Sequence, residues 1–236
     1  MLVASFAYAS VGHGGASAYI AALALAGVAP AEMRPIALVL NVLVSAIATY
    51  KFQRAGHFRW RLFWPFAAVS IPLAFLGGAI ALPGHFYKML VGIVLVYASW
   101  QLWRSARIGD EMREVREPPV ARAMAIGGGL GFLSGLTGVG GGIFLSPVLL
   151  MLGWAGTKQT SAVAAPFILV NSIAGLAGAF STKTTSLPAY VAVLAAAVLV
   201  GGWVGAEYGS RRFANPLVRR ILAVVLAAAG AKMIAV

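Results

Sequence analysis

Residues 137–142 have the sequence TGVGGG, and residues 10–17 have the related sequence SVGHGGAS. Both stretches lie inside long apolar runs, and glycine is a poor residue for a helix interior. Backbone that leaves the helical conformation at membrane depth is tolerated only where it is buried in protein or lines a cavity. We therefore predict that each stretch interrupts a helix and that the two interrupted segments approach each other.

The composition predicts a membrane protein. Of the 236 residues, 61% are hydrophobic and only 10% are charged, and the mean hydropathy is +0.88, whereas a soluble domain carries about 25% charged residues. Apolar runs close to the length of about 20 residues that crosses a bilayer recur along the whole chain. They lie at about 1–29, 35–50, 62–82, 86–103, 121–152, 159–180, 188–208 and 217–236. The expected fold class is an all-α polytopic membrane protein without a soluble domain.

Charge and residue usage exclude several classes of function. The net charge of +12 comes from basic residues that lie mostly between the apolar runs, as the positive-inside rule produces, so we expect no nucleic-acid partner. The absence of cysteine excludes disulfides, thiolate metal sites and cysteine nucleophiles. The histidines His13, His57 and His85 are scattered, and no pair has metal-ligand spacing on one helix face. We expect neither an enzyme nor a metal or other cofactor.

The chain also contains a weak internal repeat. Placing Gly12 on Gly138, an offset of 126, aligns the two glycine stretches. An asparagine follows each stretch after about thirty residues, Asn41 in LVLNVLV and Asn171 in ILVNSIA. The predicted organisation is a first transmembrane repeat over residues 1–103, a charged cytoplasmic linker over residues 104–120 and a second transmembrane repeat over residues 121–236.

The basic residues favour an inverted relation between the two halves. If every apolar run crosses the membrane once, the 18 Lys and Arg residues divide 11 inside and 7 outside. If each glycine-rich run instead doubles back as a hairpin or a pair of half-helices, they divide 14 to 4, with Arg34, Lys88, Lys183 and Lys232 outside. Inverted repeats with glycine-interrupted segments in matching positions are a sequence pointer to the binding site of a transporter.

Candidate substrate-binding residues lie in and near the two glycine stretches. Backbone N–H groups at the ends of interrupted helices carry partial positive charge and favour an anion. Asparagine and hydroxyl side chains add uncharged donors, and the scarcity of acidic residues in the apolar runs disfavours a cation. The predicted set is Gly12, His13, Gly14, Gly15, Ser17, Asn41, Thr137, Gly138, Gly140, Gly141, Gly142 and Asn171. The alternative is that the glycines permit close helix packing and the asparagines bridge neighbouring helices.

His13 and Glu207 are the residues considered for proton coupling. His13 is the stronger candidate, because histidine titrates near a pKa of about 6.5; the alternative is a structural histidine that donates to a backbone carbonyl of the broken helix. Glu207 precedes Arg211 by four residues, a spacing that predicts an interfacial ion pair on one helix face.

The stretch GLTGVGGGIFLSPVLL at residues 135–150 resembles the signature of the TauE/SafE sulfite-exporter family, also called the toluene-sulfonate uptake permease family. The matching pattern is a G-x-GGG stretch followed by proline, here Gly138, Gly140 to Gly142 and Pro147. In the first half, Ala16 stands where members often have a third glycine, and no proline follows at the matching distance. The resemblance implies a permease of the bacterial inner membrane that carries sulfite, thiosulfate or small organosulfonates and is coupled to the proton gradient.

These features together predict a secondary transporter of a small sulfur-containing oxyanion that works by alternating access, with the anion and the lipid bilayer as its partners. The alternative is a passive anion channel or uniporter, which would need a continuous pore and would show no proton coupling. A scaffold for other membrane proteins would not need two matched broken segments. A homodimer is compatible with the sequence.

Overall fold

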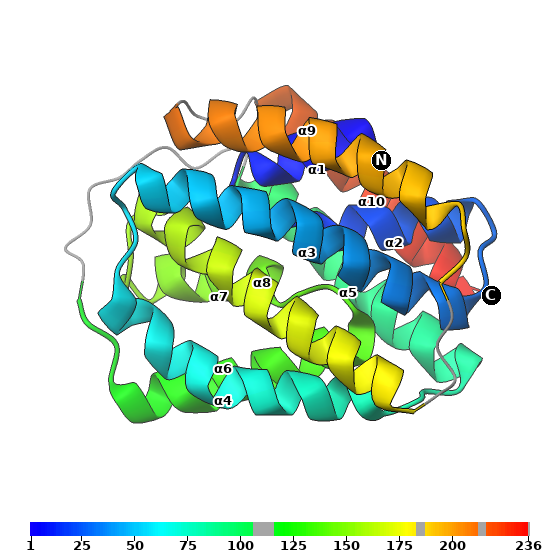
Figure 1. Cartoon of the computed structure of the whole chain (residues 1–236), viewed down its shortest axis with the longest axis horizontal. Coiled ribbons are helices and arrows are strands. Elements are labelled where there is room, and N and C mark those ends of the chain that lie inside the picture. The colour runs from blue at the N-terminus through cyan, green and yellow to red at the C-terminus, as the bar shows by residue number, and fades with distance from the viewer. Residues whose placement is uncertain (106–115, 183–186, 212–215, 236) are drawn as a thin grey trace.

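The computed structural model describes residues 1–105, 116–182, 187–211 and 216–235, so residues 106–115 of the predicted linker lie outside it. The described residues form helices and no strands (Figure 1). The helices of the first half are α1 (Leu2–Ala9), α2 (Ala16–Leu25), α3 (Pro30–Arg54), α4 (Trp60–Ala79) and α5 (Gly84–Ser105). Those of the second half are α6 (Val120–Thr137), α7 (Gly142–Met151), α8 (Thr157–Ser181), α9 (Val191–Arg211) and α10 (Pro216–Ala235). The predicted all-α class is confirmed.

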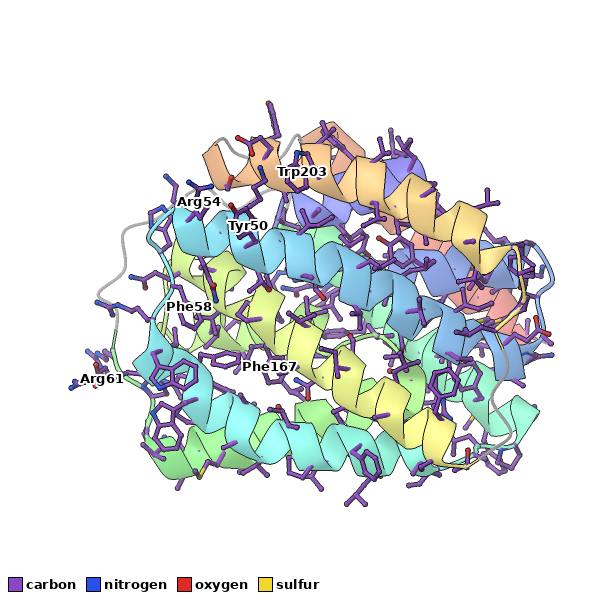
Figure 2. All side chains as sticks on the ribbon, viewed as in Figure 1. Tyr50, Arg54, Phe58, Arg61, Phe167 and Trp203 are labelled. Atoms are coloured by element: carbon purple, nitrogen blue, oxygen red, sulfur yellow. The ribbon has the colours of Figure 1, made fainter. Side chains whose placement is uncertain are left out.

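Among the described residues, five helices are long and apolar enough to cross a membrane, namely α3, α4, α6, α8 and α9. Large apolar side chains on their outer surfaces remain exposed, including Val193 at 72% and Leu76 at 52%. Such a surface suits hydrocarbon and not water. The protein is therefore a multi-pass membrane protein. Basic residues gather at one end of the bundle, called here the basic end, where Figure 2 labels Arg54 and Arg61.

Each glycine-rich run forms two helices. The first run breaks at residues 10–15, between α1 and α2, and the second breaks at residues 138–141, between α6 and α7. The later helices of the two halves match in order and length. α2 and α7 both have 10 residues, α3 and α8 both have 25, α4 and α9 have 20 and 21, and α5 and α10 have 22 and 20.

The longest helices, α3 and α8, lie side by side at the centre of the bundle and run in opposite directions (Figure 1). Asn41 of α3 lies against Ser172 of α8, and three residues earlier Leu38 lies near Gly175, three residues later in α8. α3 and α8 are therefore antiparallel. This central pair carries the polar residues around which the candidate site is built.

The helices α5 and α10 form a second antiparallel pair. Gly92 lies against Gly230, and two turns further along α5 the hydroxyl of Ser99 donates to the carbonyl of Ala223 at 2.6 Å. Small residues at the contact let the two backbones approach, which is the usual basis of helix association in a membrane.

Glycines at every fourth position allow two further helix pairs to pack backbone to backbone. The stripe on α6 is Gly127, Gly131 and Gly135, packed on α4, and the stripe on α9 is Gly201, Gly205 and Gly209, packed on α1. A Cβ added to Gly131 would lie 2.5 Å from Ser70 Cα, and one added to Gly205 would lie 2.7 Å from Phe6 Cα. The first helix of each half therefore packs on the fourth helix of the other half.

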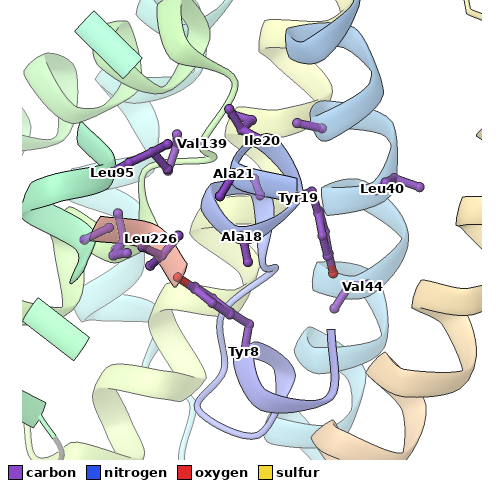
Figure 3. Packing of buried hydrophobic residues seen from close by; sticks show 14 of the residues in the cluster. Tyr8, Ala18, Tyr19, Ile20, Ala21, Leu40, Val44, Leu95, Val139 and Leu226 are labelled. Atoms are coloured by element: carbon purple, nitrogen blue, oxygen red, sulfur yellow. The ribbon is translucent and has the colours of Figure 1, made fainter. Parts of the chain in front are cut away.

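The short helices α2 and α7 are largely surrounded by protein. Tyr19 and Ile20 of α2 are fully buried with Leu40 of α3 and Leu226 of α10 in one apolar cluster (Figure 3). Leu145 of α7 is fully buried in a second cluster between α4, α7 and α8. Burial of these segments meets the condition under which interrupted backbone survives at membrane depth.

Candidate functional site

The first break turns the chain between α1 and α2. The carbonyl of Tyr8 accepts the N–H groups of Val11 at 3.1 Å and His13 at 2.9 Å, which closes the end of α1. Gly12 has φ +73° and Gly15, the N-cap of α2, has φ +97°. An L-residue with a side chain is strained in this left-handed region, so the turn requires glycine there.

The second break follows the same scheme between α6 and α7. Gly138 ends α6 with φ +81°, and its N–H donates to the carbonyl of Ser134 at 2.8 Å. Gly140 has φ +82°, and Gly141, the N-cap of α7, has φ +76°. Neither α2 nor α7 has a side-chain hydrogen bond capping its N-terminus. The N–H groups of these first turns are therefore left to other acceptors, and their partial positive charge favours an anion.

Asn41 lies between the two breaks. A Cβ added to Gly14 would overlap its Oδ1, and a Cβ added to Gly140 would overlap its Nδ2, so both glycines are needed for the chain to pass this side chain. Asn41 is fully buried, and its Nδ2 donates to Ser172 Oγ at 2.8 Å. Its buried Oδ1 has no hydrogen-bond partner within the described residues. Such an oxygen can accept a hydrogen bond from a bound molecule, and within the described residues the Oδ1 of Asn171 is in the same state.

Ile168 occupies the corresponding place on α8. Gly14 and Gly140 both lie against its Cγ2, at 3.1 and 2.9 Å from an added Cβ, as both lie against Asn41. Ile168 follows Asn41 by 127 residues, close to the offset of 126 between the glycine stretches. The matching contacts therefore pair Asn41 with Ile168, and not with Asn171.

His13 connects the first break to α7. Its Nδ1 lies 3.0 Å from the carbonyl of Val11, and its Nε2 lies 3.1 Å from Ser146 Oγ. A carbonyl only accepts, so Nδ1 carries the proton of a neutral ring and Nε2 accepts from the Ser146 hydroxyl; this tautomer follows from the hydrogen-bond network. The ring also stands edge-on to Tyr8, with centroids 6.4 Å apart. His13 thus links the first break to α7 of the second half.

Each break lies against the long central helix of the other half. Gly12 packs on Ser161 of α8, 2.7 Å from an added Cβ to the Ser161 Cβ, and Ser161 Oγ donates to Val11 O at 2.9 Å. Gly138 packs on Arg34 of α3, and the half-buried guanidinium of Arg34 donates to Ile80 O at 2.8 Å. Movement of one half against the other would change the environment of both breaks.

Of the other predicted site residues, Ser17 and Thr137 make local hydrogen bonds. Ser17 Oγ donates to Tyr8 OH at 2.8 Å, which ties α2 to α1. Thr137 Oγ1 donates to Leu133 O at 2.7 Å within α6. Asn171 Nδ2 donates to Phe167 O of its own helix at 2.7 Å. The structure therefore brings Asn41 to both glycine breaks and directs the side chain of Asn171 along α8.

The remaining predicted glycines provide room for neighbouring side chains. Gly15 lies beneath Tyr19, whose hydroxyl donates to the carbonyl of Gly14 at 2.8 Å. Gly141 lies against Phe167, and Gly142 lies against Ile168. These glycines both shape the turn and bring the start of each short helix against the central pair.

Five residues of this region were not among the predicted set, namely Arg34, Ser146, Ser161, Ile168 and Ser172. Ser172 directly follows the predicted Asn171, so the sequence indicated this part of α8 but not the residue that contacts Asn41. Carrying the offset of 126 forward from Asn41 leads to Phe167, one residue before Ile168, so the offset alone does not identify it. Ser161 and Arg34 also match each other at an offset of 127, but their residue types differ and give no sign of equivalence.

Glu207 forms a salt bridge with Lys51 of α3, and the ammonium of Lys51 also lies 4.1 Å from the centre of the Trp203 ring. The predicted partner, Arg211, has a side chain outside the described part of the structure. The salt bridge joins α3 to α9 at the basic end. A spacing argument along one helix cannot identify a partner that tertiary packing supplies.

The arrangement as a whole is typical of one class of protein. Two interrupted segments that meet at a buried polar side chain, inside an apolar helical bundle, are an arrangement found in polytopic membrane transporters. Comparison with known sequences identifies the family. The chain belongs to the sulfite exporter TauE/SafE family, whose family model matches residues 1–233.

Individual relatives agree with this assignment. The chain is 41% identical over 234 residues to the probable membrane transporter protein y4hK of Sinorhizobium fredii, covering 98% of this chain and 94% of that protein. It is 24% identical over 229 residues to the probable membrane transporter protein ORF9 of a Sinorhizobium species, covering 96% and 87%. It is 27% identical over 143 residues to the probable membrane transporter protein MJ0441 of Methanocaldococcus jannaschii, covering 59% and 52%. No solved structure gives a significant match. The similarity to bacterial membrane transporters indicates an inner-membrane protein.

Proposed function

We propose that this membrane transporter carries a small sulfur-containing oxyanion, either sulfite, thiosulfate or an organosulfonate, and that transport is coupled to protons. The observation that carries the proposal is the convergence of both glycine breaks on Asn41. It brings the uncapped N-termini of α2 and α7 toward one buried polar side chain. The family description and the resemblance of residues 135–150 support the substrate class.

The chemistry around Asn41 suits an oxyanion. Backbone N–H groups at helix starts provide partial positive charge without a titratable group. The hydroxyl of Ser172 lies beside the amide of Asn41, with 2.8 Å between Ser172 Oγ and Asn41 Nδ2. The partnerless Asn41 Oδ1 can accept a hydrogen bond from the O–H of a protonated anion such as hydrogen sulfite. Acidic side chains, which would repel such an anion, are scarce in the apolar runs.

The proposed mechanism is alternating access between two inverted repeats, residues 1–103 and 121–236. Three contacts support the inversion: α3 runs antiparallel to its counterpart α8, α5 runs antiparallel to α10, and the first helix of each half packs on the fourth helix of the other. On this arrangement each broken segment enters the membrane and returns to the same side. Rocking of one half against the other would then expose Asn41 to either side in turn.

We propose His13 as the proton-coupling residue. In the neutral ring Nε2 accepts from Ser146, and in the protonated ring Nε2 must donate, so protonation reverses the hydrogen bond that joins the first break to α7. Histidine titrates near a pKa of about 6.5, within the range that a proton gradient spans. The charge of a protonated His13 would also attract the anion, so binding of the proton would favour binding of the anion.

Flux into proteoliposomes tests the function. Purified protein is reconstituted, and uptake of sulfite, thiosulfate and a short sulfonate is measured with and without an imposed pH gradient. We expect the gradient to drive one of them above its equilibrium level. His13→Gln should abolish the gradient-driven part, whereas His85→Gln, a change at an exposed histidine, should leave it intact. Equilibration that ignores the gradient would indicate a channel or uniporter, and no flux of any of the three would remove the substrate class.

A further inference from the structure

A second polar site lies away from the glycine breaks, at the basic end of the bundle. It is a pocket of about 220 Å³ where the chain enters α4 and α6. Three arginines and one acidic residue line it together with two tryptophans: Arg59, Arg61, Arg116, Glu117, Trp64 and Trp154. None of these residues belongs to the proposed transport site, and the proposed function leaves the pocket without a role.

Two helix N-termini meet at this pocket. α4 and α6 run parallel in close contact, since Gly127 lies against Phe66 and, two turns further along both helices, Gly135 lies against Ala74. Their positive dipole ends are therefore side by side. Neither N-terminus is capped by a side-chain hydrogen bond. Two adjacent uncapped positive ends favour an anion between them.

The arginines increase this positive charge. Arg59 is the N-cap of α4, Arg61 lies in its first turn, and Arg116 precedes α6 by four residues. Glu117 is the acidic residue among the pocket residues, and the salt bridge found within the described residues joins Lys51 to Glu207 elsewhere. The guanidinium group matches the geometry of a phosphate and binds it through paired hydrogen bonds.

The frame of the pocket is fixed by packing. The N–H of Arg116 donates to the carbonyl of Gly153 at 2.9 Å, which fixes the chain entering α6 to the connection between α7 and α8. Trp154 is 7% exposed and packs with its ring 6.1 Å from that of Phe66 in α4. These contacts hold the segment that carries Arg116 against the buried rings of Phe66 and Trp154.

The outer edge of the pocket continues into a surface suited to acyl chains. Trp60 and Trp64 are exposed at 64% and 36% in the first turns of α4, as interfacial tryptophans are. Ile71 and Phe75 follow on the same helix at 38% and 40% exposure. A soluble phosphate would gain nothing from this apolar strip, whereas a lipid would lay its chain along it.

We propose that this pocket binds the phosphate of an anionic phospholipid headgroup and that the bound lipid holds the N-termini of α4 and α6 together. Since α4 belongs to the first half of the chain and α6 to the second, the lipid joins the two halves at the basic end. Basic pockets between transmembrane helices at a membrane surface are suited to anionic headgroups.

Native mass spectrometry of the full-length protein in a mild detergent tests this. Phosphatidylglycerol is titrated against the wild type and against the double variant Arg59→Gln/Arg116→Gln. Each basic residue near an anionic headgroup contributes about fivefold in affinity, so we expect the double variant to bind about 25-fold more weakly. The matched control is Arg54→Gln/Arg104→Gln, which removes the same charge from residues stacked on Tyr50 and Trp100 outside the pocket.

Further arms separate the sources of phosphate. Phosphatidylcholine should bind at least tenfold more weakly than phosphatidylglycerol, and millimolar glycerol 3-phosphate should not displace the lipid. Equal affinity of the wild type and the glutamine variant, equal binding of the two lipids, or displacement by the soluble phosphate would each overturn the proposal. If the double variant does not fold, Arg61→Gln gives the same comparison with an expected loss of about fivefold.

Discussion

Replacing Gly14 with alanine tests the contact between the first break and Asn41, on which the candidate site depends. A Cβ on Gly14 would lie 2.7 Å from Asn41 Cγ and closer still to Oδ1, whereas ordinary contact begins at 3.4 Å. Asn41 is fully buried on α3 and cannot move into solvent. It must instead rotate, which breaks its hydrogen bond to Ser172.

The magnitude follows from these two effects. Overpacking a close-packed interior costs about 1–3 kcal/mol, and a side-chain hydrogen bond inside a membrane protein contributes about 0.6 kcal/mol on average. We expect Gly14→Ala to lower the free energy of unfolding by about 2–4 kcal/mol. The φ of Gly14 lies outside the left-handed region, so the cost is steric. In an Asn41→Ala background it should fall below about 1 kcal/mol, because the obstructing side chain is gone.

Gly140→Ala provides an internal comparison. Its Cβ would also overlap the side chain of Asn41, but Gly140 has φ +82°. An alanine in the left-handed region costs about 1–2 kcal/mol whatever surrounds it. Asn41→Ala should therefore remove only part of the cost of Gly140→Ala, while it removes nearly all of the cost of Gly14→Ala.

The assay is reversible unfolding in mixed micelles of a mild detergent and dodecyl sulfate, followed by the fluorescence of the six tryptophans. Gly129→Ala is the control, because nothing lies within 4 Å of a Cβ at that position. The reasoning is refuted if Gly14→Ala costs as much without the Asn41 side chain as with it. Such a result would mean that the first break does not pass Asn41 as described.

Three further outcomes are expected. Gly131→Val should cost at least about 3 kcal/mol in the same unfolding assay, since its Cβ would meet the backbone of α4, which cannot rotate away. Lys51→Met and Glu207→Gln should show a coupling free energy of about 0.5–1 kcal/mol in a double-mutant cycle, and a value near zero would mean that the salt bridge contributes nothing. In the flux assay Asn41→Ala should lose most transport, whereas Asn171→Ala, whose side chain bonds to its own helix, should keep at least about half; equal losses would contradict the placement of the site.

Much of the fold was predictable, because a membrane restricts the choices. Apolar runs of spanning length predicted helices, and the two matched glycine stretches inside such runs predicted interruptions. The positions of the breaks at residues 10–15 and 138–141 agree with that expectation. What the glycine spacing could not give was the partner of each packed face, such as the contact of the α6 glycine stripe with α4.

The candidate site was predictable in its backbone and less so in its side chains. A one-dimensional alignment paired Asn41 with Asn171 because both are asparagines, but Asn171 lies about 4.5 Å further along α8 than Ile168. The matching contacts instead select Ile168, which shares no chemistry with Asn41. The salt bridge of Glu207 with Lys51 could not be predicted for a related reason, since Lys51 is 156 positions away and only packing brings it close.

The difference between Asn41 and Ile168 bears on the proposed mechanism. The two breaks share a backbone scheme, yet His13 in the first corresponds to Val139 in the second, at the offset of 126. In alternating access between inverted repeats, the two halves exchange roles when the transporter turns from one side to the other. Identical halves would make the two conformations equal in energy and indifferent to protons. Because His13 and Asn41 have no polar counterparts at the matching positions of the second half, the two conformations place them in different environments. Under the proposed mechanism this difference in environment, and not the shared backbone, determines the resting conformation. It also allows protonation of His13 to shift the equilibrium between the two conformations.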